Sequence, residues 1–274
     1  MFVNKRVEQT ISRFNIINLW ESRLPIALQP LASKIISETS NENPELRRKG
    51  ILKRPYTEIE RYVADMLIGT GEMVNVCEQM GFAVELLSGF RTRKMMDGLC
   101  LTRKDYIVYQ LENYYIRVNM IMDRALQLVN VAFRLGINVR KVTFKGSVEH
   151  KAICQTKVCG CLTALATTID QSRDIRHRIV HYNSYSDKEI KRIEAYYFFV
   201  KMQTHGDDKF KKKTAEIVTD DYHFYKRLTD EDIKKRKHDL RINNQRIFAQ
   251  VNELFTELLI VFETEYAKFQ EKCA

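Results

Sequence analysis

Apolar residues at helical spacing dominate the stretch from 102 to 135. They recur every three or four residues until Gly136 ends the pattern, and a second apolar row lies beside the first. The main row is Ile107, Leu111, Tyr114, Val118, Ile121, Ala125, Leu128, Ala132 and Leu135. The spacing predicts one long helix with a wide apolar face, which is typical of a central position in a helical bundle.

The rest of the chain favours helices as well. Similar spacing runs over 63–87 and 248–269, and we expect further helices near 147–178, 187–203 and 212–228. Four capping boxes indicate helix starts: Thr57/Glu60, Thr102/Asp105, Ser186/Glu189 and Thr229/Asp232. With only 10 Gly and 4 Pro in 274 residues, a fold of many short strands and turns is disfavoured.

We therefore predict an all-α fold, an up-and-down bundle of about four or five core helices with extra helices around them. Residues 1–55 look like a separate N-terminal extension, itself open to helix formation, because a stretch bounded by Pro44 and Pro55 and rich in Lys and Arg closes it. The bundle domain is expected over 56–274.

The charge balance indicates a polyanionic partner without identifying it. The chain carries 45 Lys and Arg against 35 Asp and Glu, a formal net charge of +10. Basic runs at 209–213 and 234–241 have acidic neighbours, so each is either a solvated helix face or a surface that follows an RNA backbone. The segment 134–157 has six Lys and Arg against Glu149 alone.

The N-terminus has no apolar leader, and the longest apolar run, Ala195–Val200, is too short to span a membrane, so we expect a cytoplasmic protein. The six cysteines form no CxxC pair, which argues against a disulfide framework. His150 and Cys154 share a helix face, as metal ligands can, but Cys159 and Cys161 would point in opposed directions. We expect core-filling thiols and neither a metal nor a cofactor.

The segment Arg173–Tyr185 is dense in basic and aromatic residues and lies where one predicted helix ends and the next begins. It reads RDIRHRIVHYNSY. A neutral His transfers protons near pH 7 and an Arg binds phosphate, so Arg176 and His181 could support metal-free phosphodiester cleavage. On a continuous helix the two residues lie about 140° apart, so they share a pocket only if the chain bends or the side chains wrap the turn. From the residues alone, the favoured interpretation is that these basic side chains complement the dipole at the end of a helix.

The stretch Arg176-His-Arg-Ile-Val-His181 resembles the R-x(4–6)-H motif of the HEPN superfamily. His177 fills a position that is usually polar in that family, and small or apolar residues precede the final His, as Ile179 and Val180 do. The preceding helix, with Leu111-Glu-Asn-Tyr-Tyr-Ile-Arg-Val118, is similar to that of bacterial HEPN proteins. The resemblance covers about 57–272.

The resemblance implies a homodimer whose two motifs form one site, and a metal-independent endoribonuclease. In that activity the RNA 2′-hydroxyl attacks the adjacent phosphate and leaves a 2′,3′-cyclic phosphate and a 5′-hydroxyl. Arg176, His181 and His177 would be catalytic, and Arg173, Arg178 and Tyr182 would bind RNA. Family habit also places such proteins in prokaryotic defence or toxin–antitoxin systems, with an antitoxin or nucleotidyltransferase as partner.

A polar row on the long helix includes Glu112 and Asp123. It is either a solvated face or a support that lines the groove and holds an Arg or His of the motif. Two other functions stay open: a non-catalytic HEPN module that binds RNA or a nucleotide, and a structural helical interaction protein. A DNA-reading helix-turn-helix is less attractive, because no short paired helices with a Gly-containing turn are found.

Overall fold

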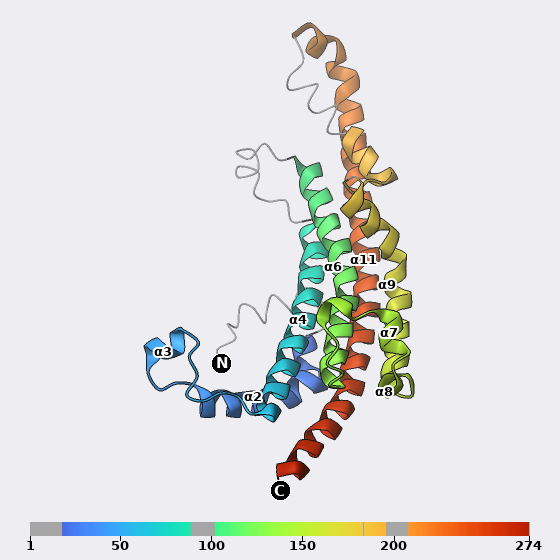
Figure 1. Ribbon diagram of the computed structural model, residues 1–274. Helices are drawn as coiled ribbons and strands as arrows, with labels where there is room; N and C mark the ends of the chain where they lie inside the picture. Colours follow the sequence, from blue (N-terminus) through green and yellow to red (C-terminus); the bar gives the residue numbers. More distant parts are fainter. Residues whose placement is uncertain (1–17, 89–101, 183, 196–207, 274) are drawn as a thin grey trace. The chain divides into compact units, whose positions relative to one another are not determined.

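The computed structural model describes residues 18–88, 102–182, 184–195 and 208–273, with the side chains of 226–271 in the last range. These residues are mostly helical and form no β-strand, which confirms the predicted all-α fold (Figure 1). The elements are η1 (Leu19–Glu21), α2 (Arg23–Thr39), α3 (Pro44–Arg48), α4 (Glu58–Leu86), α6 (Arg103–Ala132), η2 (Val139–Lys141), α7 (Phe144–Val148), α8 (Lys151–Cys154), α9 (Lys157–His181) and α11 (Asp208–Cys273). Residues 188–195 are also helical.

Helix α6 matches the predicted long helix closely. Every residue of its main apolar row from Ile107 to Ala132 is buried. At its start, Thr102 Oγ1 accepts the Asp105 N–H at 3.2 Å and Asp105 Oδ2 accepts the Thr102 N–H at 2.9 Å, which confirms that capping box. The helix ends at Ala132 and not at 135, because the backbone turns left-handed at Arg134 (φ 52°) and Gly136 (φ 66°).

The other capping boxes have three different outcomes. The Thr57/Glu60 box forms at the start of α4, with Thr57 N–H to Glu60 Oε2 at 2.8 Å. The Ser186/Glu189 prediction is off by one position, since Asp187 Oδ1 accepts the Ile190 N–H at 2.9 Å and caps 188–195. The Thr229/Asp232 prediction is wrong, because α11 continues through both residues and Asp232 instead accepts a hydrogen bond from Arg192 at 2.8 Å.

Two predicted helices also need correction. The helix expected over 147–178 is broken into α7, α8 and α9, since Thr143 caps α7 and the ring of His150 caps α8 by accepting the Ala152 N–H at 3.2 Å. The helix expected over 212–228 is part of α11, which runs unbroken from Asp208 to Cys273. The helix predicted over 187–203 is present as 188–195, and its remainder lies outside the described residues.

The chain forms two compact units. Unit 1 comprises Met1–Glu78, Val118–Gln171 and Gln245–Ala274, and unit 2 comprises Gln79–Arg117 and Ser172–Asn244. Both contain segments of α4, α6, α9 and α11, which run alternately up and down within each unit (Figure 1). The described part of the expected N-terminal extension, with α2 and α3, belongs to unit 1, and a domain boundary at residue 55 stays a prediction.

An aromatic cluster forms part of the interior of unit 1. The ring of Tyr62 stacks on the ring of Phe262, with centroids 5.5 Å apart. The ring of Phe269 is tilted against the same tyrosine, with centroids 5.7 Å apart. The Tyr62 hydroxyl donates to the Ala132 carbonyl at 2.9 Å, and burial raises its pKa. The guanidinium of Arg134 covers Phe269 at 4.2 Å from the ring centroid. These contacts join α4, the end of α6 and α11 through mostly apolar surface.

Within the ranges that the structure describes, no helix is both long enough and apolar enough to cross a membrane.

Candidate nucleic-acid site at the end of helix α9

The RxxxxH motif lies on the last two turns of α9, in unit 2. The helix is unbroken through His181, and the Tyr182 N–H still bonds to the Arg178 carbonyl at 3.0 Å. The sequence placed the motif between two helices, with the first ending near 178, so the motif is more helical than expected. Because α9 continues through it, Arg176 and His181 lie about 140° apart around one axis. The backbone of a single chain therefore does not direct both side chains to one point.

Three rings form a cluster on one side of this helix end. His177 and His181, one turn apart, have ring centroids 4.7 Å apart, and Tyr182 meets His177 edge-on at 5.5 Å. All three residues are exposed, Tyr182 with 71% of its surface. Two imidazoles in contact at an exposed helix end can share or exchange protons with a bound molecule.

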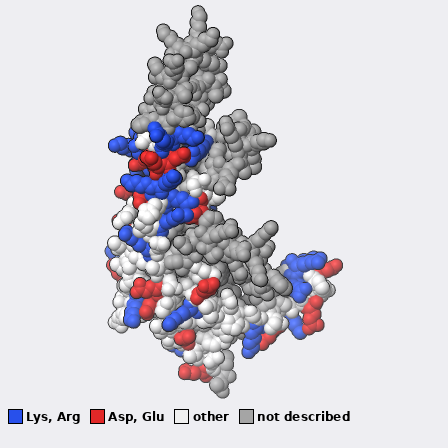
Figure 2. All heavy atoms as spheres, turned by 180° about the vertical axis from the view of Figure 1, so that it is seen from behind, with Lys and Arg blue, Asp and Glu red and all other residues white. Residues whose placement is uncertain are grey.

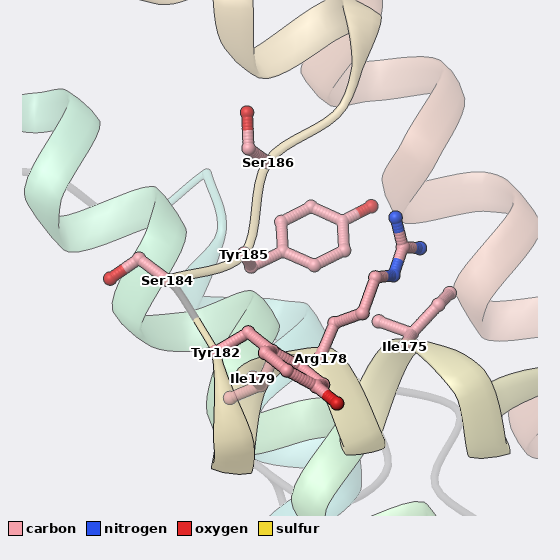
Figure 3. Close-up of a pocket in the computed structure, with 7 residues that line it drawn as sticks. All are labelled: Ile175, Arg178, Ile179, Tyr182, Ser184, Tyr185 and Ser186. Atoms are coloured by element: carbon pink, nitrogen blue, oxygen red, sulfur yellow. The ribbon is translucent and has the colours of Figure 1, made fainter.

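The adjoining face of α9 lines an open pocket of about 440 Å³ (Figure 3). Its helix residues follow helical spacing and its remaining wall is the segment after the motif. The lining consists of Ile175, Arg178, Ile179, Tyr182, Ser184, Tyr185 and Ser186. Tyr182 thus belongs both to the ring cluster and to the pocket. Arg178 extends from α9 alongside the ring of Tyr185 (Figure 3).

Tyr185 is the best-anchored residue of the pocket. Its backbone N–H donates to Glu112 Oε1 at 2.7 Å, and its ring stacks on Tyr115 with centroids 5.2 Å apart. Its hydroxyl donates to Asp187 and accepts from Arg236 Nη1 at 2.7 Å. Burial raises the pKa of Tyr185, and the neighbouring Tyr115 adds to this, so the phenol stays neutral. The wall of the pocket opposite α9 is therefore fixed from two helices, α6 and α11.

Arg236 on α11 holds this wall through charge. It bonds Asp187 at 2.7 Å and Glu189 at 3.0 Å, and only 16% of its side chain is exposed. Burial favours the neutral form of Asp187, but the hydrogen bonds from Tyr185 and Ile190 and the charge of Arg236 outweigh it and lower the pKa of Asp187. Sequence reasoning missed Arg236 because it lies 51 residues from Tyr185, inside a run that resembled a solvated basic face.

Six arginines of unit 2 differ in whether they have a carboxylate partner. Four have carboxylate partners within 2.8 Å: Arg103 with Asp230, Arg192 with Asp232, Arg236 with Asp187 and Arg241 with Glu85. Arg176 and Arg178, in contrast, are exposed and form no ion pair with any residue that the structure describes. Two cations at the motif are therefore available for an anion from outside.

A scan against family models gives one decisive observation. Residues 91–259 match the model of the Cthe2314-like HEPN family. The chain belongs to this HEPN family. The match covers the motif and most of α6, α9 and α11, and it confirms the resemblance inferred from Arg176 and His181. No curated protein and no solved structure matched the chain.

The remaining predicted residues of the HEPN site take different positions. Arg173 is exposed two turns before the end of α9 and takes part in a further interaction. Glu112 contacts the segment after the motif, where it accepts a hydrogen bond from the Tyr185 backbone N–H. Asp123 is exposed and lies in unit 1. The predicted polar row ends at Asn130, which is buried and bonds both the N–H and the carbonyl of Ile137, so that row is not one solvated face.

The basic segments predicted for the HEPN protein lie in different units. The 234–241 run lies on α11 in unit 2, where Figure 2 shows Lys and Arg gathered with Asp and Glu between them. The six basic residues of 134–157 are all exposed but belong to unit 1, and three of them pair with Glu58, Glu149 and Glu257. The side chains of 209–213 lie outside the described residues.

The cysteine cluster has no metal-site geometry in the described structure. No group of three or more His, Cys, Asp or Glu that could hold a metal occurs among the described residues. His150 caps α8, Cys154 is exposed, and Cys161 is buried in unit 1, where burial raises the pKa of its thiol to about 11. The prediction of core-filling thiols is therefore confirmed for Cys161 and wrong for Cys154.

Proposed function

We propose that the protein is a metal-independent endoribonuclease of HEPN type. The observation that carries the proposal is the exposed end of α9 in a HEPN chain, where two histidine rings lie 4.7 Å apart beside Arg176 and Arg178. Both arginines are without a described carboxylate partner. Imidazoles supply general acid–base catalysis near neutral pH, and guanidinium groups bind phosphate. These are the side chains that phosphodiester cleavage without a metal requires.

In the proposed reaction the 2′-hydroxyl of RNA attacks its own adjacent phosphorus and the bond to the 5′-oxygen of the next nucleotide breaks. His181 takes the proton from the 2′-hydroxyl or gives one to the leaving oxygen, and His177 assists through its ring contact. Arg176 stabilises the negative charge on the pentacoordinate phosphorus. The products carry a 2′,3′-cyclic phosphate and a 5′-hydroxyl.

A second chain completes this site in the proposal. Arg176 and His181 lie about 140° apart around the axis of an unbroken helix, so their side chains leave a single α9 in different directions. Two α9 ends that meet about a twofold axis would bring Arg176 of one chain to His181 of the other, since such an interface is self-complementary. The homodimer with a composite site therefore stays part of the proposal.

The test uses end-labelled single-stranded RNA with the wild-type protein and the His181→Ala protein, each with and without EDTA. We expect wild type to cut RNA in EDTA, to leave 2′,3′-cyclic phosphate ends, and to spare DNA of the same sequence. His181→Ala should lose about 100-fold to 10,000-fold of the rate, the range for a general acid–base group. His181 is exposed, so this change leaves the helical core intact.

The matched control is His238→Ala, which removes another exposed histidine of unit 2, on α11. It should cut as wild type does. Cleavage that persists undiminished in His181→Ala, or that disappears in EDTA, would overturn the proposal.

A non-catalytic HEPN module that binds RNA is the second candidate. The separation of Arg176 and His181 on one helix favours it if the protein does not dimerise. Intact RNA with binding that weakens steeply as salt rises would support this function. A place in a defence or toxin–antitoxin system, with an antitoxin or nucleotidyltransferase partner, stays a prediction from the family alone.

A further inference from the structure

The pocket beside the motif has the composition of a site for a flat, partly polar ligand. Its walls combine aliphatic surface from Ile175 and Ile179, the rings of Tyr182 and Tyr185, and the cation of Arg178 (Figure 3). Its volume of about 440 Å³ falls within the range of small-ligand pockets. Aromatic faces bind nucleobases by stacking, and a nearby guanidinium binds the phosphate attached to the base.

One wall of the pocket is rigid and the other is open. Tyr185 is 7% exposed and is held by Glu112, Tyr115 and Arg236, as described above. Tyr182, the residue that follows α9, is 71% exposed. A large exposed aromatic side chain beside a fixed aromatic wall is more typical of a binding surface than of a core.

Tyr182 also links the pocket to the proposed chemistry. Its ring meets His177 edge-on at 5.5 Å, and His177 lies 4.7 Å from His181. A base held against Tyr182 would therefore place its ribose and phosphate next to the two histidines. Arg178 lines the same pocket and has no described carboxylate partner, so it can receive that phosphate.

We infer that this pocket binds one unpaired nucleobase of the RNA, stacked on Tyr182, next to the phosphate that is cut. The inference rests on the proposed function, because it identifies which part of the RNA lies beside the motif. It implies that the protein acts on single-stranded RNA, since a paired base is stacked inside a duplex and does not enter a side pocket.

Binding measured in the His181→Ala protein tests the inference without requiring cleavage. The probes are a fluorescein-labelled oligouridylate, an oligoadenylate, and an abasic ribose–phosphate oligomer of the same length and charge. We expect at least one of the base-containing probes to bind more tightly than the abasic probe. Adding Tyr182→Ala should weaken that probe by roughly fivefold to 100-fold, the range for one lost stacking contact, and leave the abasic probe unchanged.

Two further variants make the result specific. Tyr182→Phe keeps the ring and should bind as its parent does. Tyr109→Ala removes another exposed tyrosine of unit 2, on α6 and outside the pocket, and should also leave binding unchanged. Arg178→Ala should weaken all three probes, since it removes a phosphate contact.

Equal affinity of the Tyr182→Ala protein and its parent for every probe would overturn the inference, as would equal weakening of the abasic probe. The outcome is independent of cleavage. If Tyr182→Ala weakens binding only of base-containing probes and the protein never cuts RNA, the pocket is upheld and the nuclease is contradicted. If the protein cuts RNA and Tyr182→Ala has no effect on binding, the nuclease is upheld and the pocket is contradicted.

Discussion

The buried tyrosines of the two compact units are held by different interactions. In unit 1, Tyr62 lies between Phe262 and Phe269, and its hydroxyl bonds to a backbone carbonyl. In unit 2, Tyr185 lies between Tyr115 and a charged group, with its hydroxyl shared by Asp187 and Arg236. Each unit thus has a buried tyrosine, one whose hydroxyl bonds to a backbone carbonyl and one whose hydroxyl bonds to two charged side chains.

The difference follows from what each unit holds. Unit 2 carries the HEPN motif, with Arg176, Arg178, His177 and His181 exposed at one helix end. The segment that follows the motif is fixed by ion pairs, which hold polar side chains in definite directions, as a site requires. Unit 1 has no part of the motif, and the contacts around its Tyr62 are mostly apolar, so that truncating one of these side chains leaves a cavity. We therefore expect variants in unit 1 to affect stability first, and variants in unit 2 to affect the site as well.

Phe262→Ala should have the largest effect on stability. The ring is 3% exposed and stacks on Tyr62, so its removal leaves a cavity and costs about 3–5 kcal/mol of unfolding free energy. Urea denaturation followed by circular dichroism measures the loss. RNA cleavage by the remaining folded protein should be unchanged. A loss below about 1 kcal/mol would mean that this aromatic cluster does not stabilise unit 1 as its burial indicates.

Arg236→Ala should come next, at about 2–3 kcal/mol, because it leaves Asp187 and Glu189 partly buried without their cation. Unlike Phe262→Ala, it should also slow RNA cleavage in protein that is still folded, since Tyr185 loses its anchor. Arg103→Ala is the matched control. Its ion pair with Asp230 is more exposed, and its loss should cost less than about 1 kcal/mol and leave cleavage unaffected.

Removing one hydroxyl from each unit compares the two environments directly. Tyr62→Phe loses a neutral hydrogen bond and should cost about 1 kcal/mol. Tyr185→Phe loses hydrogen bonds to charged groups and should cost about 1.5–2 kcal/mol. Thermal unfolding at low and high salt gives both values, and only the Tyr185 value should fall as salt rises. Equal losses of unfolding free energy in the two variants, with equal salt dependence, would show that the two tyrosine hydroxyls are held by similar interactions.

Acid titration tests an ion pair of unit 1 through its pH dependence. The hydrogen bonds from Arg54 lower the pKa of Glu60 to about 2, from an ordinary value of 4.5. Because the folded pKa is the lower one, the ionised carboxylate stabilises the protein above pH 4.5, and this contribution is lost as the pH falls toward 2. The Glu60→Gln protein should lose less unfolding free energy between those pH values than wild type does. Parallel losses in both proteins would show that Glu60 titrates normally.

Local features were predictable from the sequence. The spacing of α6 and two of the capping boxes depend on residues within one or two turns, so the pattern determines them. The same local logic failed where a longer-range contact intervened. Asp232 was expected to cap a helix but bonds Arg192, 40 residues away, while α11 passes through. His150, expected to lie within a helix, caps a short one.

In the candidate site, too, some residues were predictable from the sequence and others were not. The family motif directed attention to Arg176, His177 and His181, and Tyr182 was included as a neighbour in the sequence. The pocket depends on Tyr185 and Arg236, which no local pattern connects, since their contact joins positions 51 residues apart. Glu112 was expected to support the motif, and it does touch this region, but through the Tyr185 backbone.

The central claim, that Arg176 and His181 of two chains act together on RNA, is tested most directly by mixing two inactive variants. Arg176→Ala and His181→Ala should each fail to cut end-labelled RNA in EDTA. After equimolar mixing and subunit exchange, half of the dimers would hold one intact site, so cleavage should return to about one quarter of the wild-type rate. A mixture as inactive as its components, although exchange has occurred and wild type cuts the RNA, would contradict the composite site.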